Sequence, residues 1–287
     1  MEKHPLISVV LTTCDRPSLC ERALRSCAAQ TDRRFEVILI DDGTIPLDID
    51  FSCLGVELIY HYTGGKKGAP FGRNVGSRLA TTAWITFLDD DDFLGVDRIK
   101  NLIGFMQGDD SATYKFLGTT TVKVEGDSHS RFKGDVPGIF GLHDFFEQCI
   151  VGISCLIRKD LLVEAGGFDE EMTGSQDWEL WMRVLKHGGK MIKWDTLDYF
   201  ATLDSPNRIT SSIKRATGFR KILEKHGACM SPTQRNYFLC LSRLAGLNRV
   251  GLFEVLLECY RHRTIMPLKV ALKIEFIMSR NFFRGVL

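Results

Sequence analysis

The chain has 287 residues, of which 44% are hydrophobic and 25% charged, an ordinary globular composition with enough length for one large domain with an extension or for two domains. Its formal net charge is +1 at pH 7 and it contains no arginine-rich tract or repeat, so we expect no nucleic-acid partner. The nine cysteines show no C-x-x-C pair and no metal-ligand spacing, which argues against a disulfide framework or a zinc site.

The N-terminal segment, MEKHPLISVVLTT, changes from charged to apolar over a stretch that is too short for a signal peptide. No uninterrupted apolar run approaches the ~18 residues of a membrane-spanning helix. The scattered cysteines fit reduced thiols. These features predict a cytoplasmic protein that is neither secreted nor membrane-spanning.

Short β-branched runs alternate with helical patterns through the first third of the chain. Residues 6–11, LISVVL, are typical of a buried strand, and after the loop TTCDRP a helix is expected from Pro17 to about Ala29. Further buried strands are expected at 35–43, 56–62 and 83–90, with a helix carrying RNVGSRLA before the last of them. This order predicts an α/β fold with a mostly parallel sheet, helices on both faces, and ligands at the carboxyl ends of the strands.

Four consecutive carboxylates, Asp89 to Asp92, follow the last of these strands in the stretch FLDDDDFL. Two like charges ~4 Å apart repel by about 1 kcal/mol in water and by roughly 4 kcal/mol at a protein-like dielectric. No lysine or arginine occurs between Thr81 and Val96 to relieve that repulsion. Two interpretations remain: a solvated acidic loop, or a site completed by a cation that the sequence does not supply.

A second strand also ends in acids, at Asp41 and Asp42, so both acidic groups should lie at the same edge of the sheet. Crowded carboxylates at a ligand-binding edge suit Mg²⁺ or Mn²⁺ shared with substrate phosphates. The phosphate-binding signatures of P-loops and dinucleotide folds are absent, so a nucleotide would be held by side chains. Thr12, Asp42 and Arg73 have suitable groups, although each alone fits a turn cap or a surface helix equally well.

Six motifs together resemble family 2 glycosyltransferases with the GT-A fold. They are ISVVLTTCDRP, VILIDDGT, GAPFGRNVGSRLA, FLDDDD, GGFDE and QDWELWMRV, in the order and approximate spacing of that family. The resemblance covers roughly residues 7–189, about two thirds of the chain. It implies a Rossmann-like nucleotide-sugar-binding and catalytic domain at 1–206, followed by a helical C-terminal extension at 207–287.

The resemblance also implies roles for individual residues. Thr12, Asp15 and Asp42 would line the uridine pocket, and Arg73 would lie over the base or near the phosphates. Asp42 would accept a hydrogen bond from the uracil N3–H.

Asp89 and Asp91 would form the metal and ribose motif of the resemblance, with Asp91 the firmer metal ligand. The family usually has a small or neutral residue between these two acids, whereas this chain has Asp90. Which neighbour of Asp91 binds the metal and which binds the ribose therefore stays open.

Asp177 is the catalytic base that the resemblance implies. It would lie in the first turn of a helix from about Ser175 to His187, where the helix dipole favours an ionised carboxylate. The family usually has Glu-Asp here, and Gln176 replaces the glutamate. Without the resemblance, an acid in the first turn of a helix would be interpreted only as a contribution to helix capping. The neighbouring Trp178 and Trp181 have the spacing of core residues, so we expect them to pack inside rather than stack on a sugar.

Beyond about Asn207 the resemblance ends and helical patterns rich in lysine and arginine follow. Residues 251–287 interleave six basic residues with apolar ones, which fits a basic amphipathic segment in peripheral contact with an anionic membrane. The alternative is a helical annex packed on the catalytic domain or on a second subunit in a homodimer.

These observations favour a metal-dependent, inverting glycosyltransferase. It would transfer a sugar from a nucleotide donor, a UDP-sugar, to a hydroxyl of a glycan or lipid-linked glycan. A sugar nucleotidyltransferase would need a GGxGTR-type loop where this chain has TTCDRP. A non-catalytic carbohydrate-binding protein on a transferase scaffold would have lost the acids that this chain retains.

Overall fold

The computed structural model describes residues 4–49, 51, 54–132, 135–202 and 212–245. The chain forms two compact units. The first unit comprises Met1–Glu170 and Asp177–Asn207, and the second comprises Glu171–Gln176 and Arg208–Leu287. The predicted basic amphipathic segment at 251–287 lies outside the described residues.

The centre of the first unit is a sheet whose middle strands are buried on both sides. β1 (Ile7–Thr13) and β2 (Phe35–Asp41) are buried at every position, as expected for parallel strands that read as continuous apolar runs. β1 pairs in parallel with β2 on one side and with β4 (Trp84–Asp89) on the other. The strands expected from the sequence are therefore confirmed here.

The strand order of the main sheet is β3-β2-β1-β4-β9-β6-β10-β5. The remaining strands are β3 (Glu57–Tyr62), β5 (Asp92–Leu94), β6 (Phe116–Glu125), β7 (Ser128–Arg131), β8 (Gly138–Phe140), β9 (Cys155–Arg158) and β10 (Met191–Thr202). β9 runs antiparallel to both of its neighbours, which makes the sheet mixed. The expectation that residues 56–62 form a buried strand was wrong, because β3 is the edge strand and its side chains are half-buried or exposed.

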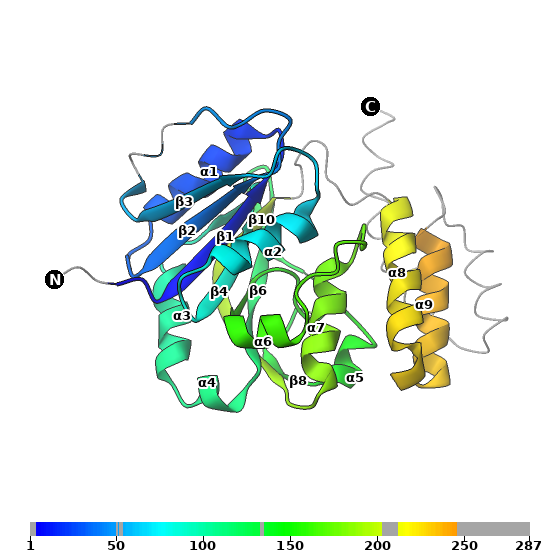
Figure 1. Ribbon diagram of the computed structural model, residues 1–287. Coiled ribbons are helices and arrows are strands. Elements are labelled where there is room, and N and C mark those ends of the chain that lie inside the picture. Colours follow the sequence, from blue (N-terminus) through cyan, green and yellow to red (C-terminus); the bar gives the residue numbers. More distant parts are fainter. Residues whose placement is uncertain (1–3, 50, 52–53, 133–134, 203–211, 246–287) are drawn as a thin grey trace. The chain divides into compact units, whose positions relative to one another are not determined.

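Helices cover both faces of the sheet (Figure 1). α1 (Pro17–Ala28) and α2 (Ala69–Leu79) lie on opposite faces, as right-handed crossovers in opposite directions require. The other helices of the first unit are α3 (Arg98–Gln107), α4 (Asp110–Thr113), α5 (Leu142–Phe145), α6 (Lys159–Glu164) and α7 (Gln176–Lys186). Among the described residues, none of the helices combines the length and the apolar character that crossing a membrane requires.

The packing of α2 against β1 is unusually close. A Cβ atom on Gly76 would lie 2.4 Å from Cγ1 of Val10, a distance that no real side chain tolerates. The second glycine of GRNVG is therefore required by packing. The second residue of that motif, Arg73, lies on the same helix and is buried in the unit.

The second unit contains α8 (Ser212–His226), the 3₁₀ turn η2 (Gly227–Cys229) and α9 (Pro232–Ala245). α8 and α9 lie side by side (Figure 1), and the rings of Phe219 and Phe238 meet edge to face with centroids 6.3 Å apart. Their packing buries apolar side chains of both helices.

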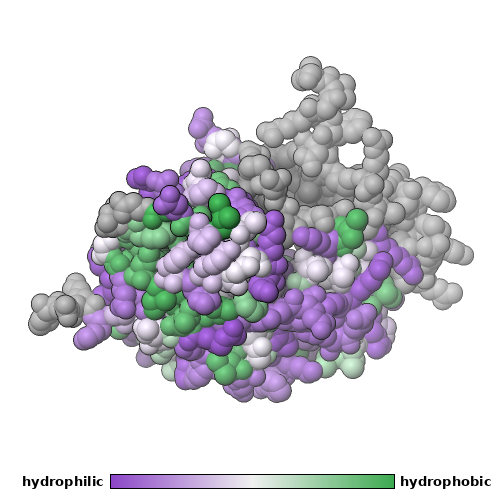
Figure 2. Space-filling view, turned by 45° about the horizontal axis from the view of Figure 1, so that its top comes forward, coloured by the Kyte–Doolittle hydropathy of each residue, from purple (hydrophilic) through white to green (hydrophobic). Residues whose placement is uncertain are grey.

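The surface in Figure 2 is mixed, with hydrophobic residues gathered mainly on the left of the view among hydrophilic ones.

Candidate active site

The acids that end two strands meet at one edge of the sheet. Thr12 of β1 is in register with Asp89 of β4, and Thr13 is in register with Asp41 of β2. The expectation that both acidic groups share one edge is therefore confirmed. This edge is the carboxyl end of the parallel strands, where α/β folds bind their ligands.

Three acids of the four-residue run face one another. Asp89, Asp91 and Asp92 each offer one carboxylate oxygen, and these oxygens all lie within 4.8 Å of one another. Asp92 is buried, and it accepts hydrogen bonds from the Tyr199 hydroxyl (3.0 Å) and the Thr202 amide (3.1 Å). Burial, together with the charges of Asp89 and Asp91, raises the pKa of Asp92 well above its usual range. Such a set of converging oxygens fits a divalent cation.

Asp92 and its partner Tyr199 were missed by the sequence argument as site residues. The run of four acids was visible, but its resemblance to a family motif directed attention to the first three. The contact of Asp92 with Tyr199 joins residues more than a hundred positions apart, and no periodicity in the sequence reports it.

The counter-charges of the acidic run come from arginines far away in the sequence. Arg16 pairs with Asp90 and lies 3.3 Å from Asp91, and Arg73 lies 2.6 Å from Asp89. The choice between a solvated loop and a cation missing from the sequence was therefore incomplete. The fold itself supplies part of the compensating positive charge, since Arg16 just before α1 and Arg73 on α2 each place a guanidinium at the end of β4.

Asp90 lies outside the group of three converging carboxylates. Its side chain is fully buried, and its oxygens accept hydrogen bonds from Thr13 Oγ1 (2.7 Å) and from Nε (3.0 Å) and Nη2 of Arg16. Burial raises the pKa of Asp90 to about 6, against the opposing effects of Arg16 and Thr13.

Arg73 lies inside the first unit, 5% exposed. Its guanidinium packs over the ring of Phe168 at 5.4 Å and binds Asp89, while its Nε and Nη1 have no hydrogen-bond partner within the described part of the chain. Burial alone would lower the pKa of Arg73, but the adjacent Asp89 and the charge of Asp177 raise it. This buried cation therefore interacts with the acidic run and with the candidate base.

The turn GGFDE is fixed to α2 by Asn74, another residue that the sequence argument missed. Its amide nitrogen donates to the Phe168 carbonyl (2.8 Å), and its amide oxygen accepts from the Phe168 amide (2.8 Å). These two bonds hold the Phe168 ring where Arg73 packs over it. The motifs GRNVG and GGFDE are thus in direct contact.

Asp42 and Asp15, expected in a uridine pocket, both hold loops at this edge. Asp42 is 5% exposed, and its carboxylate accepts from Thr63 Oγ1 (2.5 Å), Lys67 N (2.9 Å) and Gly68 N (2.7 Å). Asp15 is exposed and accepts from the amide and hydroxyl of Thr44. The Thr44 amide hydrogen bond lowers the pKa of Asp15.

Thr12 lies beside α2, where a Cβ atom on Gly72 would meet its methyl group at 3.2 Å. The structure thus places Thr12, Asp15 and Asp42 near the ends of β1 and β2, as the sequence argument expected.

Asp177 lies in the first turn of α7 and is half-buried. Its Oδ1 accepts from the amide of Trp178 (2.8 Å), and its Oδ2 would be 3.3 Å from a Cβ atom on Gly152. Burial raises the pKa of Asp177 above its ordinary value, although the Trp178 amide and Arg73 act in the opposite direction. The helix dipole was expected to favour the ionised carboxylate here, whereas burial, which favours the neutral form, is the largest effect on its pKa.

The aromatic residues beside Asp177 belong to the core, as expected. Trp178 is 7% exposed and donates to the Phe145 carbonyl, and Trp181 is fully buried and stacks on Phe116. Glu179, the other acid in this turn, is buried in an ion pair with Arg183. Glu179 is therefore not available to a substrate.

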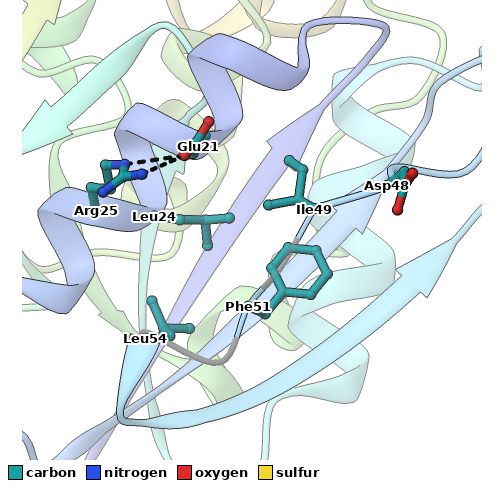
Figure 3. A pocket seen from close by; sticks show the side chains of 7 residues that line it. All are labelled: Glu21, Leu24, Arg25, Asp48, Ile49, Phe51 and Leu54. Carbon is teal, nitrogen blue, oxygen red and sulfur yellow. Dashed lines mark hydrogen bonds and ion pairs between the residues drawn. The ribbon is translucent and has the colours of Figure 1, made fainter.

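A separate cavity of about 400 Å³ lies between α1 and the segment that follows β2 (Figure 3). Apolar side chains of both elements point into it, and the ion pair of Glu21 and Arg25 lies on its α1 side. None of the predicted site residues lines this cavity.

Comparison with known proteins identifies the family. The model of "Glycosyl transferase family 2" matches residues 8–162, more than half of the chain. The chain is 25% identical over 248 residues to WcaA of Escherichia coli (strain K12), provisionally named a colanic acid biosynthesis glycosyl transferase, and the match covers 83% of this chain and 88% of WcaA.

A second relative is the GalNAc(5)-diNAcBac-PP-undecaprenol beta-1,3-glucosyltransferase of Campylobacter jejuni, 27% identical over 63% of this chain and 60% of the relative. The chain spans only 30% of an uncharacterized glycosyltransferase of Rickettsia conorii.

Solved structures share the fold. Residues 1–349 of S. aureus TarS in complex with UDP-GlcNAc align with a TM-score of 0.65 and 19% identity, over 84% of this chain and 72% of that one. The mannosyltransferase PcManGT of Pyrobaculum calidifontis, in complex with GDP-Man and Mn²⁺, aligns with a TM-score of 0.60 and 17% identity, over 97% of this chain and 88% of that one. With the strand order and acidic edge described above, these findings show that the chain belongs to glycosyltransferase family 2 and is a glycosyltransferase with the GT-A fold.

Proposed function

We propose that the protein transfers a sugar from a UDP-linked donor to a hydroxyl of a glycan or lipid-linked glycan, with inversion at the anomeric carbon. The observation that carries the proposal is the group of three converging carboxylate oxygens at the carboxyl end of β4, joined through Arg73 to the half-buried Asp177. The converging carboxylates would hold a cation that in turn binds the donor diphosphate, and Asp177 would accept a proton from the acceptor.

Asp89 and Asp91, with Asp92 beside them, would hold Mn²⁺ or Mg²⁺. When bound, such a cation supplies positive charge for the leaving diphosphate. Arg73 fixes Asp89 at 2.6 Å and places a buried positive charge beside the acids that would hold the cation.

Asp177 would accept the proton of the attacking hydroxyl. Its raised pKa makes it a stronger base than an exposed aspartate, and the Trp178 amide fixes its orientation at 2.8 Å. A base that activates the acceptor stands opposite the leaving diphosphate, so direct displacement inverts the anomeric carbon.

The donor and acceptor classes follow from the pocket residues and from the relatives. Asp42 and Thr12, near the ends of β2 and β1, would contact the base and ribose, and the TarS and PcManGT complexes contain UDP-GlcNAc and GDP-Man respectively. The Campylobacter jejuni relative is named for an undecaprenol-linked acceptor. A lipid-linked acceptor would place this protein on the cytoplasmic face of a membrane.

A donor screen tests the proposal. Purified protein is incubated with UDP-Glc, UDP-GlcNAc, UDP-Gal and GDP-Man, with Mn²⁺ or with EDTA, and release of UDP or GDP is measured. We expect metal-dependent UDP release that Asp91→Asn abolishes. Asp97→Asn is a matched control, because Asp97 binds the hydroxyl of Thr31 outside the acidic run. GDP release alone would contradict the UDP assignment. In a parallel incubation with UTP and a sugar 1-phosphate, pyrophosphate release would favour the nucleotidyltransferase alternative.

A further inference from the structure

Arg16 holds two acids of the run at once. Its Nε and Nη2 bind the two oxygens of Asp90, and its Nη1 lies 3.3 Å from Oδ2 of Asp91. A planar guanidinium can make this pattern because its N–H groups point in fixed directions. Asp90 therefore determines the plane of Arg16, and Arg16 in turn contacts the side chain of Asp91.

Asp90 is itself fixed from behind. Thr13 Oγ1 donates to its Oδ2 at 2.7 Å, and its side chain is fully buried. With Thr13 and Arg16 both bound to it, Asp90 is not one of the three acids, Asp89, Asp91 and Asp92, whose oxygens converge. In this orientation it is not part of the surface that a ligand would reach.

The main chain of the run is held by an arginine of α1, the helix that Arg16 precedes. Nη2 of Arg22 donates to the carbonyl oxygen of Asp91 (2.5 Å) and to the hydroxyl of Thr202 (3.0 Å). Arg16 and Arg22 thus fix the side chain and the backbone of Asp91 separately. The rotation of the Asp91 carboxylate then depends chiefly on Arg16.

We infer that Asp90 is the buried anchor of Arg16 rather than a ligand of metal or ribose, and that the pair acts as a positioning device that orients Asp91. The inference rests on the proposed function, because it assumes that Asp91 holds a divalent cation. It leaves Asp89 as the acid that shares metal and ribose contacts with Asp91. Losing an interaction that orients a metal ligand typically lowers metal affinity on the order of 10–100-fold.

Two variants test the inference. Arg16→Lys keeps a positive charge beside Asp90 but loses the planar fork, so it can neutralise Asp90 without holding Asp91. Asp90→Asn keeps the shape and removes the charge that fixes Arg16. Arg25→Lys in α1 is the control, because Arg25 is exposed and pairs with Glu21, away from the acidic run.

Calorimetric titration with UDP, in Mn²⁺ and in EDTA, provides the readout, and thermal unfolding in EDTA checks that each variant folds. We expect both variants to bind UDP in EDTA with wild-type affinity. They should require on the order of 10–100-fold more Mn²⁺ to reach the higher UDP affinity that the metal gives. Arg25→Lys should match wild type throughout.

The outcomes separate the inference from the proposed function. If folded Arg16→Lys needed no more Mn²⁺ than wild type to raise its UDP affinity, the inference would be overturned while the proposed function would stand. Weaker UDP binding by Asp90→Asn in EDTA would also overturn it, because a ribose contact needs no metal. If Mn²⁺ did not raise the UDP affinity of the wild-type protein, both the inference and the proposed metal site would be overturned.

Discussion

Replacing Asp177 by asparagine tests the proposed chemistry most directly. Asparagine keeps the size of the side chain and an oxygen that can accept from the Trp178 amide, so the first turn of α7 should be preserved. Arg73 loses the attraction of one carboxylate but keeps its 2.6 Å ion pair with Asp89. The substitution therefore removes the proton acceptor and little else.

The expected loss of turnover follows from general-base catalysis. A positioned base typically contributes about 10²–10⁴-fold, which corresponds to roughly 2.7–5.4 kcal/mol in the activation barrier. UDP and Mn²⁺ should still bind with wild-type affinity in calorimetry, because Asp177 is not placed to contact either. The measurement is kcat from UDP release at saturating donor and acceptor.

The pH dependence gives a second readout of the same residue. Because burial raises the pKa of Asp177, the protonated and inactive form persists to higher pH than for an exposed aspartate. Wild-type kcat should therefore rise with pH through this raised pKa, and the rise should be missing from Asp177→Asn. Near wild-type turnover in the variant, or a retained anomeric configuration in the product, would refute the assignment and direct attention to Asp169.

Four further predictions concern the donor site, the packing and the C-terminal segment. Asp91→Ala should abolish the difference in UDP affinity between Mn²⁺ and EDTA, and a persisting difference in calorimetry would contradict the role of Asp91. Asp42→Ala should weaken UDP binding by roughly 1–3 kcal/mol, with thermal unfolding as a control because Asp42 also holds the loop at residues 63–68. Gly76→Ala should destabilise the fold by about 1–3 kcal/mol through overpacking against Val10, and an unchanged denaturant midpoint would show that α2 can shift without cost. A chain ending at residue 250 should release UDP normally but float less with anionic liposomes, and equal flotation would leave only a packing role for residues 251–287.

The strands that carry the site were predictable because burial leaves a pattern in the sequence. β1, β2 and β4 are buried on both faces, and their continuous apolar runs mark them and the acids at their ends. β3 was expected to be buried as well, yet it lies at the sheet edge, since strand order is a property of the whole sheet and not of one segment. Its polar residues Glu57 and His61 fit that edge position. The antiparallel strand β9 has only four residues, too few for a pattern.

The partners of the site residues were not predictable in the same way. Arg16 and Asp90 are separated by 74 positions, and nothing in the periodicity of either segment indicates that they meet. Asn74 presents the same difficulty, because its contacts are to the backbone of Phe168 and so require no particular side chain there. Motif order located the acids, but only the packing of α1 and α2 shows how they are compensated.

The arginines around the acidic run also determine the sign of the charge that a donor encounters. Three guanidinium groups, from Arg16, Arg22 and Arg73, contact the run of four acids, and the raised pKa of Asp92 favours its neutral form, so the run without a cation carries little net charge. A nucleotide diphosphate approaching alone would meet little electrostatic attraction from the run, whereas one arriving with or after a divalent cation would meet a site of net positive charge. The same acids and arginines would thus impose an order of assembly, with the cation before or together with the nucleotide, and the rate of donor association would fall as ionic strength rises.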